Sequence, residues 1–298
     1  LTPRTILEAI RPPKSLFIIG GGTIGVEIAQ LMATFGTKVY LAEVAARLLP
    51  KEDEEVGQLM ERQLEERKGV TSLTQARVLV AQKEGLGKKV TYNRGGVEKS
   101  VRVDEILIAC GRQPSVDLGL ENAAVKYTPR GIEVNQHLQT SAKHIYAAGD
   151  VLGHNSHTHT ALLESRVAAH NLLYKQKSSP DYTATPRLTF TFPGVASVGL
   201  NEDDCIKRDL TIRKAIAPLN MIARSNTSDF RDGFVKLIAD RNGVLLGATV
   251  VAPHASEIIH ELALAVKFGL TAANVASTPH AFLSWSEAVR VAASRIGA

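Results

Sequence analysis

The strongest constraint on the fold is a set of glycines between a short apolar segment and a helical pattern. The apolar residues 16–19 end at Gly20, and Gly22 and Gly25 follow at the spacing of a turn that opens a helix. A short apolar run closed by glycine is typical of a buried parallel strand. We therefore expect Gly20 to permit a sharp turn, Gly22 to leave the backbone open, and Gly25 to let the helix pack closely.

This strand–turn–helix unit has the features of a dinucleotide site. The helix expected to begin with Thr23 and Ile24 would direct unpaired N–H groups and the positive end of its dipole at a phosphate. Glu43 ends the next apolar strand, where a carboxylate can accept hydrogen bonds from both ribose hydroxyls. Because that carboxylate would repel a 2′-phosphate, the sequence favours NAD over NADP. Arg47 could reach a 2′-phosphate, although a solvated arginine is the favoured interpretation. The alternative to a dinucleotide site is a glycine-rich turn in some other parallel α/β unit.

Composition narrows the class of protein. The 298 residues suffice for two or three domains, and 44% of them are hydrophobic, as in ordinary globular proteins. No apolar run approaches the roughly 20 residues that cross a bilayer, and the first residues lack a signal-peptide core, so we expect a cytoplasmic protein with no membrane partner. Cys110 and Cys205 are too far apart in sequence to indicate a disulfide framework or a zinc site. The net charge is +5, but the lysines and arginines are scattered among acidic residues, so no nucleic-acid partner is expected.

Hydrophobic periodicity predicts three regions along the chain. The first, 1–110, should form one compact α/β domain, and 111–180 a mixed region. From 181 to 298, strands followed by helices predict an α+β domain. The predicted helices cover 53–67, 161–174, 256–268 and 286–293. Besides 16–19, the predicted strands include a β-meander within 77–80 and 88–103, and the segments 105–110, 144–148, 187–198, 234–239 and 244–251.

Five motifs occur along the chain in a fixed order: GGGTIGVEIA, ILIACGRQP, HIYAAGDV, GFVKLI and TPHAFLSWSEAV. Their wording and order resemble the pyridine nucleotide-disulphide oxidoreductase family, which includes lipoamide dehydrogenase, glutathione reductase and mercuric reductase. The resemblance implies an α/β fold with a Rossmann-like NAD-binding domain over 1–110, the closing part of an FAD-binding domain over 111–180, and an α+β dimerisation domain over 181–298. It also implies a homodimer and a small-molecule or disulfide electron acceptor.

The resemblance assigns roles to further residues. It implies that Asp150, preceded by Gly149, would hydrogen-bond the ribityl chain of the flavin. It places Gly111 and Arg112 near the bound nucleotide. It also implies that Glu27 would face the flavin and the nicotinamide.

One departure from the family concerns the start of the chain. The family begins with its own glycine-rich FAD turn and a redox-active cysteine pair, and both should precede the position at which this chain starts. The chain by itself is therefore expected to bind FAD poorly, although FAD is expected in the complete family site.

A second departure lies near the C-terminus, where disulfide-reducing members carry His-x-His-Pro. Phe282 occupies the position of the second histidine, and Glu287 matches the acid that orients it. Phenylalanine cannot carry a proton, so disulfide exchange assisted from this position is not expected. His280 is a candidate substitute, weighed against a packed or surface histidine. Mercuric reductases carry tyrosine and leucine at 282 and 283, but the chain lacks their C-terminal cysteine pair, so mercury reduction is not predicted.

Three histidines could suggest a metal site. His154, His157 and His159 lie within six residues, but a polar loop before a helix explains them, so no metal is predicted.

Taken together, the motifs predict an NADH-dependent flavoprotein oxidoreductase whose final electron acceptor is not specified by the sequence. The alternative is a non-catalytic or truncated NAD-binding and dimerisation module.

Overall fold

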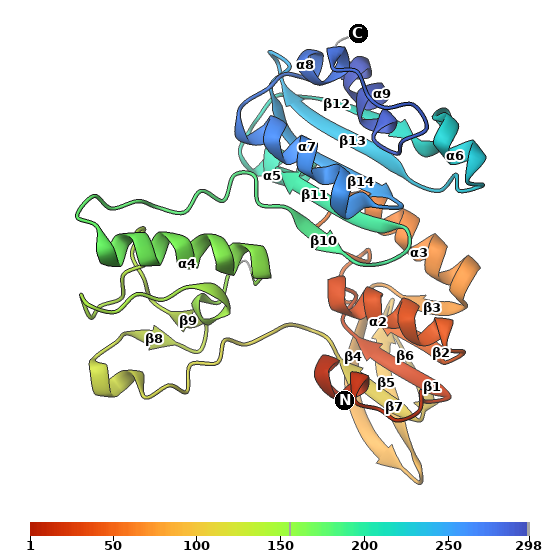
Figure 1. Cartoon of the computed structure of the whole chain (residues 1–298). Helices are drawn as coiled ribbons and strands as arrows, with labels where there is room; N and C mark the ends of the chain where they lie inside the picture. The colour runs from red at the N-terminus through yellow and green to blue at the C-terminus, as the bar shows by residue number, and fades with distance from the viewer. Residues whose placement is uncertain (155, 297–298) are drawn as a thin grey trace. The chain divides into compact units, whose positions relative to one another are not determined.

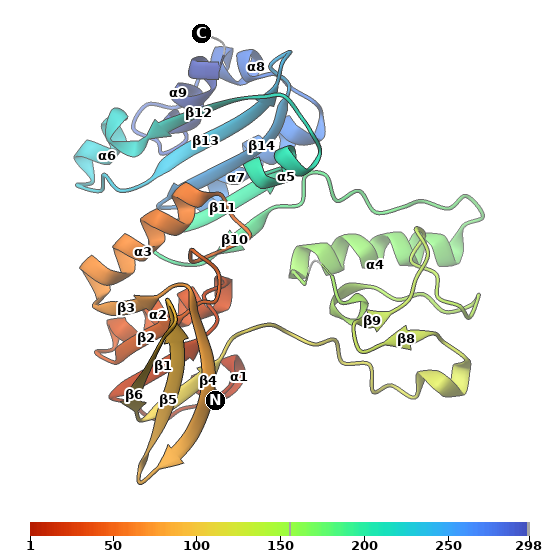
Figure 2. The same cartoon turned by 180° about the vertical axis from the view of Figure 1, so that it is seen from behind.

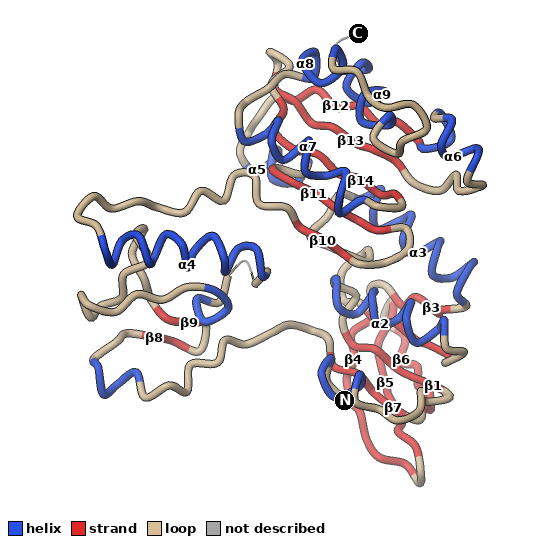
Figure 3. The backbone as a smooth tube through the Cα atoms, in the orientation of Figure 1, coloured by secondary structure: helices blue, strands red, loops and turns tan. Residues whose placement is uncertain are grey.

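The computed structural model describes residues 1–154 and 156–296. Within it the chain forms two compact units, shown in Figures 1 and 2. The first contains Leu1–Cys110 together with the chain from Leu188 onward, and the second is Gly111–Arg187. Figure 3 shows that the first unit holds most of the strands, whereas the second contains long loops around a single long helix.

The first unit begins with a parallel sheet. A short helix, α1 (Pro3–Leu7), precedes β1 (Ser15–Ile19), and the strand order is β3-β2-β1-β7. The other strands are β2 (Lys38–Ala42), β3 (Val70–Leu73) and β7 (Glu105–Ile108). Two helices connect the first three strands, α2 (Thr23–Thr34) and α3 (Glu54–Lys68). The predicted strand–turn–helix unit is therefore present, with β1 in the centre of the sheet.

Both faces of this sheet are buried, which explains why its strands are continuous apolar runs. Because side chains alternate along a strand, Leu16 and Ile18 join the core beneath the helices. Phe17 points the other way, into a core shared with the meander. The meander consists of β4 (Ala76–Glu84), β5 (Gly87–Arg94) and β6 (Val97–Val103), and Figure 2 shows it on the side of the sheet away from α2.

The C-terminal part of the first unit is a five-stranded sheet with helices packed against it. Its strand order is β10-β11-β14-β13-β12, and the pairs from β11 to β12 are antiparallel. The strands are β10 (Arg187–Thr189), β11 (Gly194–Gly199), β12 (Ile212–Pro218), β13 (Phe234–Asp240) and β14 (Leu245–Ala252). The helices are α5 (Glu202–Lys207), α6 (Ala223–Thr227), α7 (Ala255–Lys267), α8 (Ala272–Ser277) and α9 (Glu287–Ile296). Helices α7 and α9 pack on the sheet, as Figure 1 shows.

A continuous apolar core joins the two parts of the first unit. Val195, Phe234 and Val251, from the C-terminal sheet, belong to the same buried cluster as the side chains beneath α2 and α3. The two parts therefore exclude water from a common interior, which accounts for their forming a single compact unit.

The second unit is built around α4 (Thr158–Leu173). It also holds the short pair β8 (Tyr127–Thr128) and β9 (Gly131–Ile132), and the 3-10 turns η1 (Leu120–Ala123) and η2 (Gly149–Leu152). The prediction of a strand over 144–148 is wrong, because this segment makes only one bridge, between Tyr146 and Gln139. Its backbone bonds close a local turn with 138–142 instead of extending a ladder.

Within the described residues, no helix combines the length and the apolar character that crossing a membrane would require.

Adjacent residues of β7 test the layered arrangement. We expect Leu107→Ala to lower the free energy of unfolding by about 2–5 kcal/mol, because Leu107 is fully buried beneath the helices. Ile108→Ala should change it by less than about 0.5 kcal/mol, since that side chain is 53% exposed. Urea denaturation followed by circular dichroism measures both. Equal losses would contradict the assignment of the two faces.

Candidate functional site

The three glycines of the turn meet three different surroundings. Gly20 has a φ of +110°, and a Cβ there would lie 2.6 Å from the carbonyl oxygen of Ala109. A Cβ at Gly25 would lie 1.8 Å from the carbonyl oxygen of Gly20. Around Gly22 no atom lies within 4 Å of a Cβ position, and its φ of −74° suits any residue. The fold thus requires glycine at 20 and 25, whereas at 22 glycine leaves a space open.

The open space lies at the start of α2. Gly22 is the N-cap and has no side chain that could accept from the first turn of the helix. The helix therefore offers N–H groups and the positive end of its dipole where backbone can be approached closely. Thr23 and Ile24 form that first turn, and Ile24 packs against the core below. A pyrophosphate fits this surface, because it needs donors and a path free of side chains.

Glu43 is fixed beside the turn. It follows β2, is 8% exposed, and accepts hydrogen bonds from the backbone N–H groups of Gly21 (2.7 Å) and Ala45 (2.8 Å). Each bond uses a different carboxylate oxygen, and each oxygen retains a lone pair for a hydroxyl donor. The backbone thereby fixes the orientation of the predicted ribose-binding group before any ligand is present.

Gly21 also belongs to the turn, although the glycine spacing did not indicate it. A Cβ at Gly21 would lie 2.7 Å from the Leu48 side chain and 2.8 Å from the Cβ of Glu43. Only glycine lets the turn approach that closely. The signal was the run of three consecutive glycines, of which the spacing rule uses two.

Arg47 differs from its sequence-based interpretation as a solvated side chain. Its guanidinium forms an ion pair with Asp203 (2.9 Å) and donates to the carbonyl oxygen of Glu52 (3.2 Å). The side chain is 26% exposed. Its charge is therefore already engaged within the first unit.

Glu27 lies on a face of α2 that is hydrogen-bonded to the segment after β10. The N–H of Phe190 donates to Glu27 (2.7 Å), and Gln30 exchanges two hydrogen bonds with the backbone of Phe192 (2.7 and 3.0 Å). Burial raises the pKa of the Glu27 carboxyl above its ordinary value, although the Phe190 N–H favours the ionised form. Glu27 is thus a half-buried carboxyl group held by backbone from the C-terminal part.

The second unit brings together its own predicted residues. Arg112 forms an ion pair with Asp150 (2.8 Å), whose side chain is 45% exposed. Gly149 has a φ of +82°, and its N–H donates to the buried carboxylate of Glu164 (2.6 Å). Gly111, with a φ of +138°, begins the segment that carries Arg112. An accessible carboxylate at a turn of fixed backbone fits hydrogen bonding to a polyol such as a ribityl chain.

Near the C-terminus, the structure pairs His280 with an unpredicted acid. The Nε2 atom of His280 lies 3.0 Å from Glu261, and its Nδ1 atom lies 2.8 Å from the carbonyl oxygen of Thr278. Its side chain is 5% exposed, so both ring nitrogens are occupied in a buried setting. Burial raises the pKa of Glu261, and the neighbouring His280 opposes that rise. No sequence spacing indicated Glu261, which lies on α7.

Glu287 and Phe282 are not part of that pair. The Phe282 side chain is 75% exposed. One carboxylate oxygen of Glu287 is buried and has no hydrogen-bond partner among the described residues. The other oxygen lies 3.8 Å from Arg290, so the acid that the resemblance assigns to orient a histidine contacts an arginine instead.

The three closely spaced histidines contact different groups. His159 bonds the carbonyl oxygen of Pro186 (2.8 Å) and stacks on His157 (5.2 Å between ring centres), while His154 lies 3.9 Å from Glu164. Across residues 1–154 and 156–296, no group of three or more histidine, cysteine or acidic side chains is arranged to hold a metal ion.

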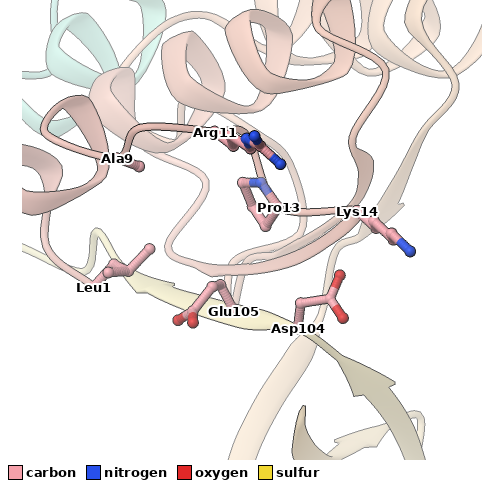
Figure 4. A pocket seen from close by; sticks show the side chains of 7 residues that line it. All are labelled: Leu1, Ala9, Arg11, Pro13, Lys14, Asp104 and Glu105. Atoms are coloured by element: carbon pink, nitrogen blue, oxygen red, sulfur yellow. The ribbon is translucent and has the colours of Figure 1, made fainter. Parts of the chain in front are cut away.

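A surface pocket of about 450 Å³ lies at the opposite end of the parallel sheet from the glycine turn. Lys14 immediately precedes β1, and Asp104 and Glu105 lie at the start of β7, as Figure 4 shows. Ligands of open parallel sheets bind at the carboxyl ends of the strands, so this pocket is not part of the candidate site.

Comparison with known proteins gives two family matches, which together cover most of the chain. Residues 2–165 match the pyridine nucleotide-disulphide oxidoreductase family, and residues 185–293 match the dimerisation domain of that family. A dihydrolipoyl dehydrogenase of Geobacillus stearothermophilus is 37% identical over 94% of this chain and 60% of its own length. A mercuric reductase of Streptomyces lividans is 36% identical over 98% of this chain and 62% of its own length. The chain thus spans about 60% of the length of these relatives.

Solved structures agree with the sequence matches. LpdA from Mycobacterium tuberculosis superposes with a TM-score of 0.89 at 30% identity, covering 99% of this chain and 64% of that one. The HOCl-induced flavoprotein disulfide reductase RclA from Escherichia coli gives 0.89 at 28% identity, covering 99% and 67%. These matches confirm the predicted fold class, a Rossmann-like α/β region followed by a dimerisation domain.

Two substitutions separate the open glycine from the packed one. Gly22→Leu should abolish NADH binding while leaving the thermal midpoint nearly unchanged, because its side chain would enter the open space. Gly25→Ala should lower the free energy of unfolding by about 3 kcal/mol or more, because its Cβ would collide with backbone. Fluorescence titration and thermal unfolding measure the two effects. Normal NADH binding by the Gly22 variant would remove the turn from the site.

Proposed function

The chain belongs to the pyridine nucleotide-disulphide oxidoreductase family, and we propose that it carries the NADH-binding and dimerisation regions of a flavoprotein oxidoreductase. One observation carries the proposal: the open backbone at Gly22 lies at the start of α2, beside a turn to which the Glu43 carboxylate is hydrogen-bonded. A diphosphate would bind the N–H groups at the helix start. The adjoining ribose would donate its hydroxyl hydrogens to Glu43.

The charges around the turn support NADH over NADPH. Glu43 is buried and accepts only from neutral N–H donors in the described contacts, so its negative charge opposes a 2′-phosphate. Arg47, the nearest cation in sequence, is engaged by Asp203. A 2′-phosphate would have to displace Asp203 to recruit that arginine.

The flavin would accept the hydride that the nicotinamide supplies when both are bound. The chain's own part is positioning. In this proposal Asp150 holds the polyol chain of the flavin, and its ion pair with Arg112 orients that carboxylate. Glu27, which accepts a hydrogen bond from the Phe190 N–H, is the carboxyl group that would face the nicotinamide.

The electron acceptor is a small molecule or a disulfide whose reduction does not use a histidine at position 282. Phe282 supplies no proton there, and both ring nitrogens of His280 are bonded to protein oxygens. A proton donated by His280 would first require breaking one of these bonds. A homodimer is proposed from the dimerisation-domain match, and a cytoplasmic location stays a prediction from the sequence.

The second candidate is a non-catalytic NAD-binding and dimerisation module. The observation that favours it is Glu287, whose buried carboxylate oxygen has no hydrogen-bond partner among the described residues. Such a module would retain the glycine turn and Glu43 while having no use for a proton carrier near the C-terminus.

Flavin reduction distinguishes the two candidates. In the purified chain, supplied with FAD and freed of unbound flavin, visible flavin absorbance that bleaches when NADH is added without oxygen would support the oxidoreductase. A colourless protein that still binds NADH would support the module. The same titration with Asp150→Asn should retain less flavin, because the carboxylate acceptor is lost.

Replacing the ribose-binding acid tests the choice of nucleotide. Glu43→Ala should weaken NADH binding by roughly ten- to hundredfold, the range expected for hydrogen bonds to a charged group. NADPH binding should weaken less, because removal of the negative charge also relieves repulsion. Damage to the turn would weaken both nucleotides equally, so the ratio of the two dissociation constants is the decisive measurement. Glu98→Ala, an exposed substitution in the meander, serves as the control.

A further inference from the structure

A buried lysine of the C-terminal sheet contacts the start of α3. Lys236 lies on β13 with 1% of its side chain exposed. Its Nζ atom lies 3.3 Å from Asp53 and 2.8 Å from Glu55, and it also forms an ion pair with Glu202. Burial lowers the pKa of Lys236, but the bonds to Glu202 and Glu55 outweigh this and leave the pKa above its ordinary value. The lysine therefore remains charged and paired inside the protein.

Further contacts from the C-terminal part reach the same stretch of chain, residues 44–55, which we term the anchor segment. These contacts involve side chains or backbone of the segment and the end of β11 or the start of α5. They are Ser197 Oγ to Glu52 (2.5 Å), Asn201 Nδ2 to the Lys51 carbonyl (2.9 Å), the Glu202 N–H to Asp53 (3.0 Å), and Arg47 to Asp203 (2.9 Å). Polar contacts with the C-terminal part therefore fix the segment at Arg47 and over residues 51–55.

The first half of the anchor segment also contacts the glycine turn. The N–H of Leu49 donates to the carbonyl oxygen of Gly21 (2.8 Å), and the fully buried Leu48 packs against the same glycine. Glu43 directly precedes the segment and accepts from the N–H of Ala45, its second residue. A shift of the segment would therefore move both the turn and the ribose-binding carboxylate.

We propose that Ser197 and Lys236 are positioning residues for the NADH site, acting through the anchor segment on Gly21 and Glu43. The inference rests on the proposed NADH-binding function. Neither side chain contacts the open space at Gly22. Each one holds residues of the anchor segment, and the segment holds the glycine turn. The dimerisation region thereby sets how well the glycine turn at Gly20–Gly25 is pre-organised.

Two matched serines provide the test. Ser197 and Ser225 are both buried in the C-terminal part, and each donates one hydrogen bond, to Glu52 (2.5 Å) and to the Phe230 carbonyl (2.6 Å). Ser197→Ala should raise the dissociation constant for NADH by roughly two- to thirtyfold, the range seen for residues that couple to a site without touching it. Ser225→Ala, which lies off the anchor segment, should leave the dissociation constant unchanged although it also removes a buried hydrogen bond.

A double-mutant cycle provides a readout that general destabilisation would not move. In a Glu43→Ala background, Ser197→Ala should weaken NADH binding by a smaller factor than it does in the otherwise unmodified chain, because one of the two groups that it positions is absent. Glu55→Gln, a change of charge at a partly exposed site, provides a second variant if Ser197→Ala does not fold, and it should weaken NADH binding in the same way.

The outcomes are distinguishable. Normal NADH affinity in the Ser197 and Glu55 variants, or an equal loss in Ser225→Ala, would overturn the positioning role while leaving the NADH site in place. Additive losses in the double-mutant cycle would also overturn it. Failure of the unmodified chain to bind NADH would instead overturn the proposed function on which the inference rests.

Discussion

The close approach of α2 to the end of β1 is the constraint on which the rest of the structure depends. Gly25 contacts the Gly20 carbonyl where a methyl group could not fit, so the helix begins directly over the turn. That position brings the first N–H groups of α2 to the edge of the sheet and leaves the space at Gly22 open. The hydrogen bonds from Gly21 and Ala45 to Glu43 then set the geometry of the neighbouring acid. The absence of a side chain at Gly25 thus determines where α2 begins, beside the Glu43 carboxylate.

The second organising feature is the management of buried charge. Lys236 is enclosed among acids, and removing a charged group from water is favourable only when partners replace its hydration. The partners come from the start of α3 and from α5, while apolar side chains of both parts share one core. Burial of apolar side chains stabilises the contact between the two parts, and the ionic contacts fix the position of the parallel sheet relative to the C-terminal sheet. The glycine turn is therefore built on a support that includes the C-terminal sheet.

Near the C-terminus, local chemistry differs from the pattern that the family resemblance supplies. Phe282 is exposed, Glu287 has a buried oxygen without a partner, and His280 is bonded to Glu261 on α7. The sequence places His280 and Glu287 in one motif, but helix packing gives the histidine a different acid. A carboxylate nineteen positions away in sequence could not be chosen by spacing alone, because its proximity depends on how α7 lies on the sheet.

The sequence by itself determined the strand–glycine–helix unit, the meander, the α+β character of the C-terminal region and the identity of the acid at the end of β2. These follow from hydrophobic periodicity and from the spacing of the glycines, which are local properties of the sequence. The strand predicted at 144–148 failed because its backbone donors found nearby acceptors. Tertiary structure alone decided the role of Gly21, the engagement of Arg47 by Asp203, the pairing of His280 with Glu261 and the enclosure of Lys236. Each depends on residues distant in sequence meeting at van der Waals or hydrogen-bond distance, and only the packed chain fixes such distances.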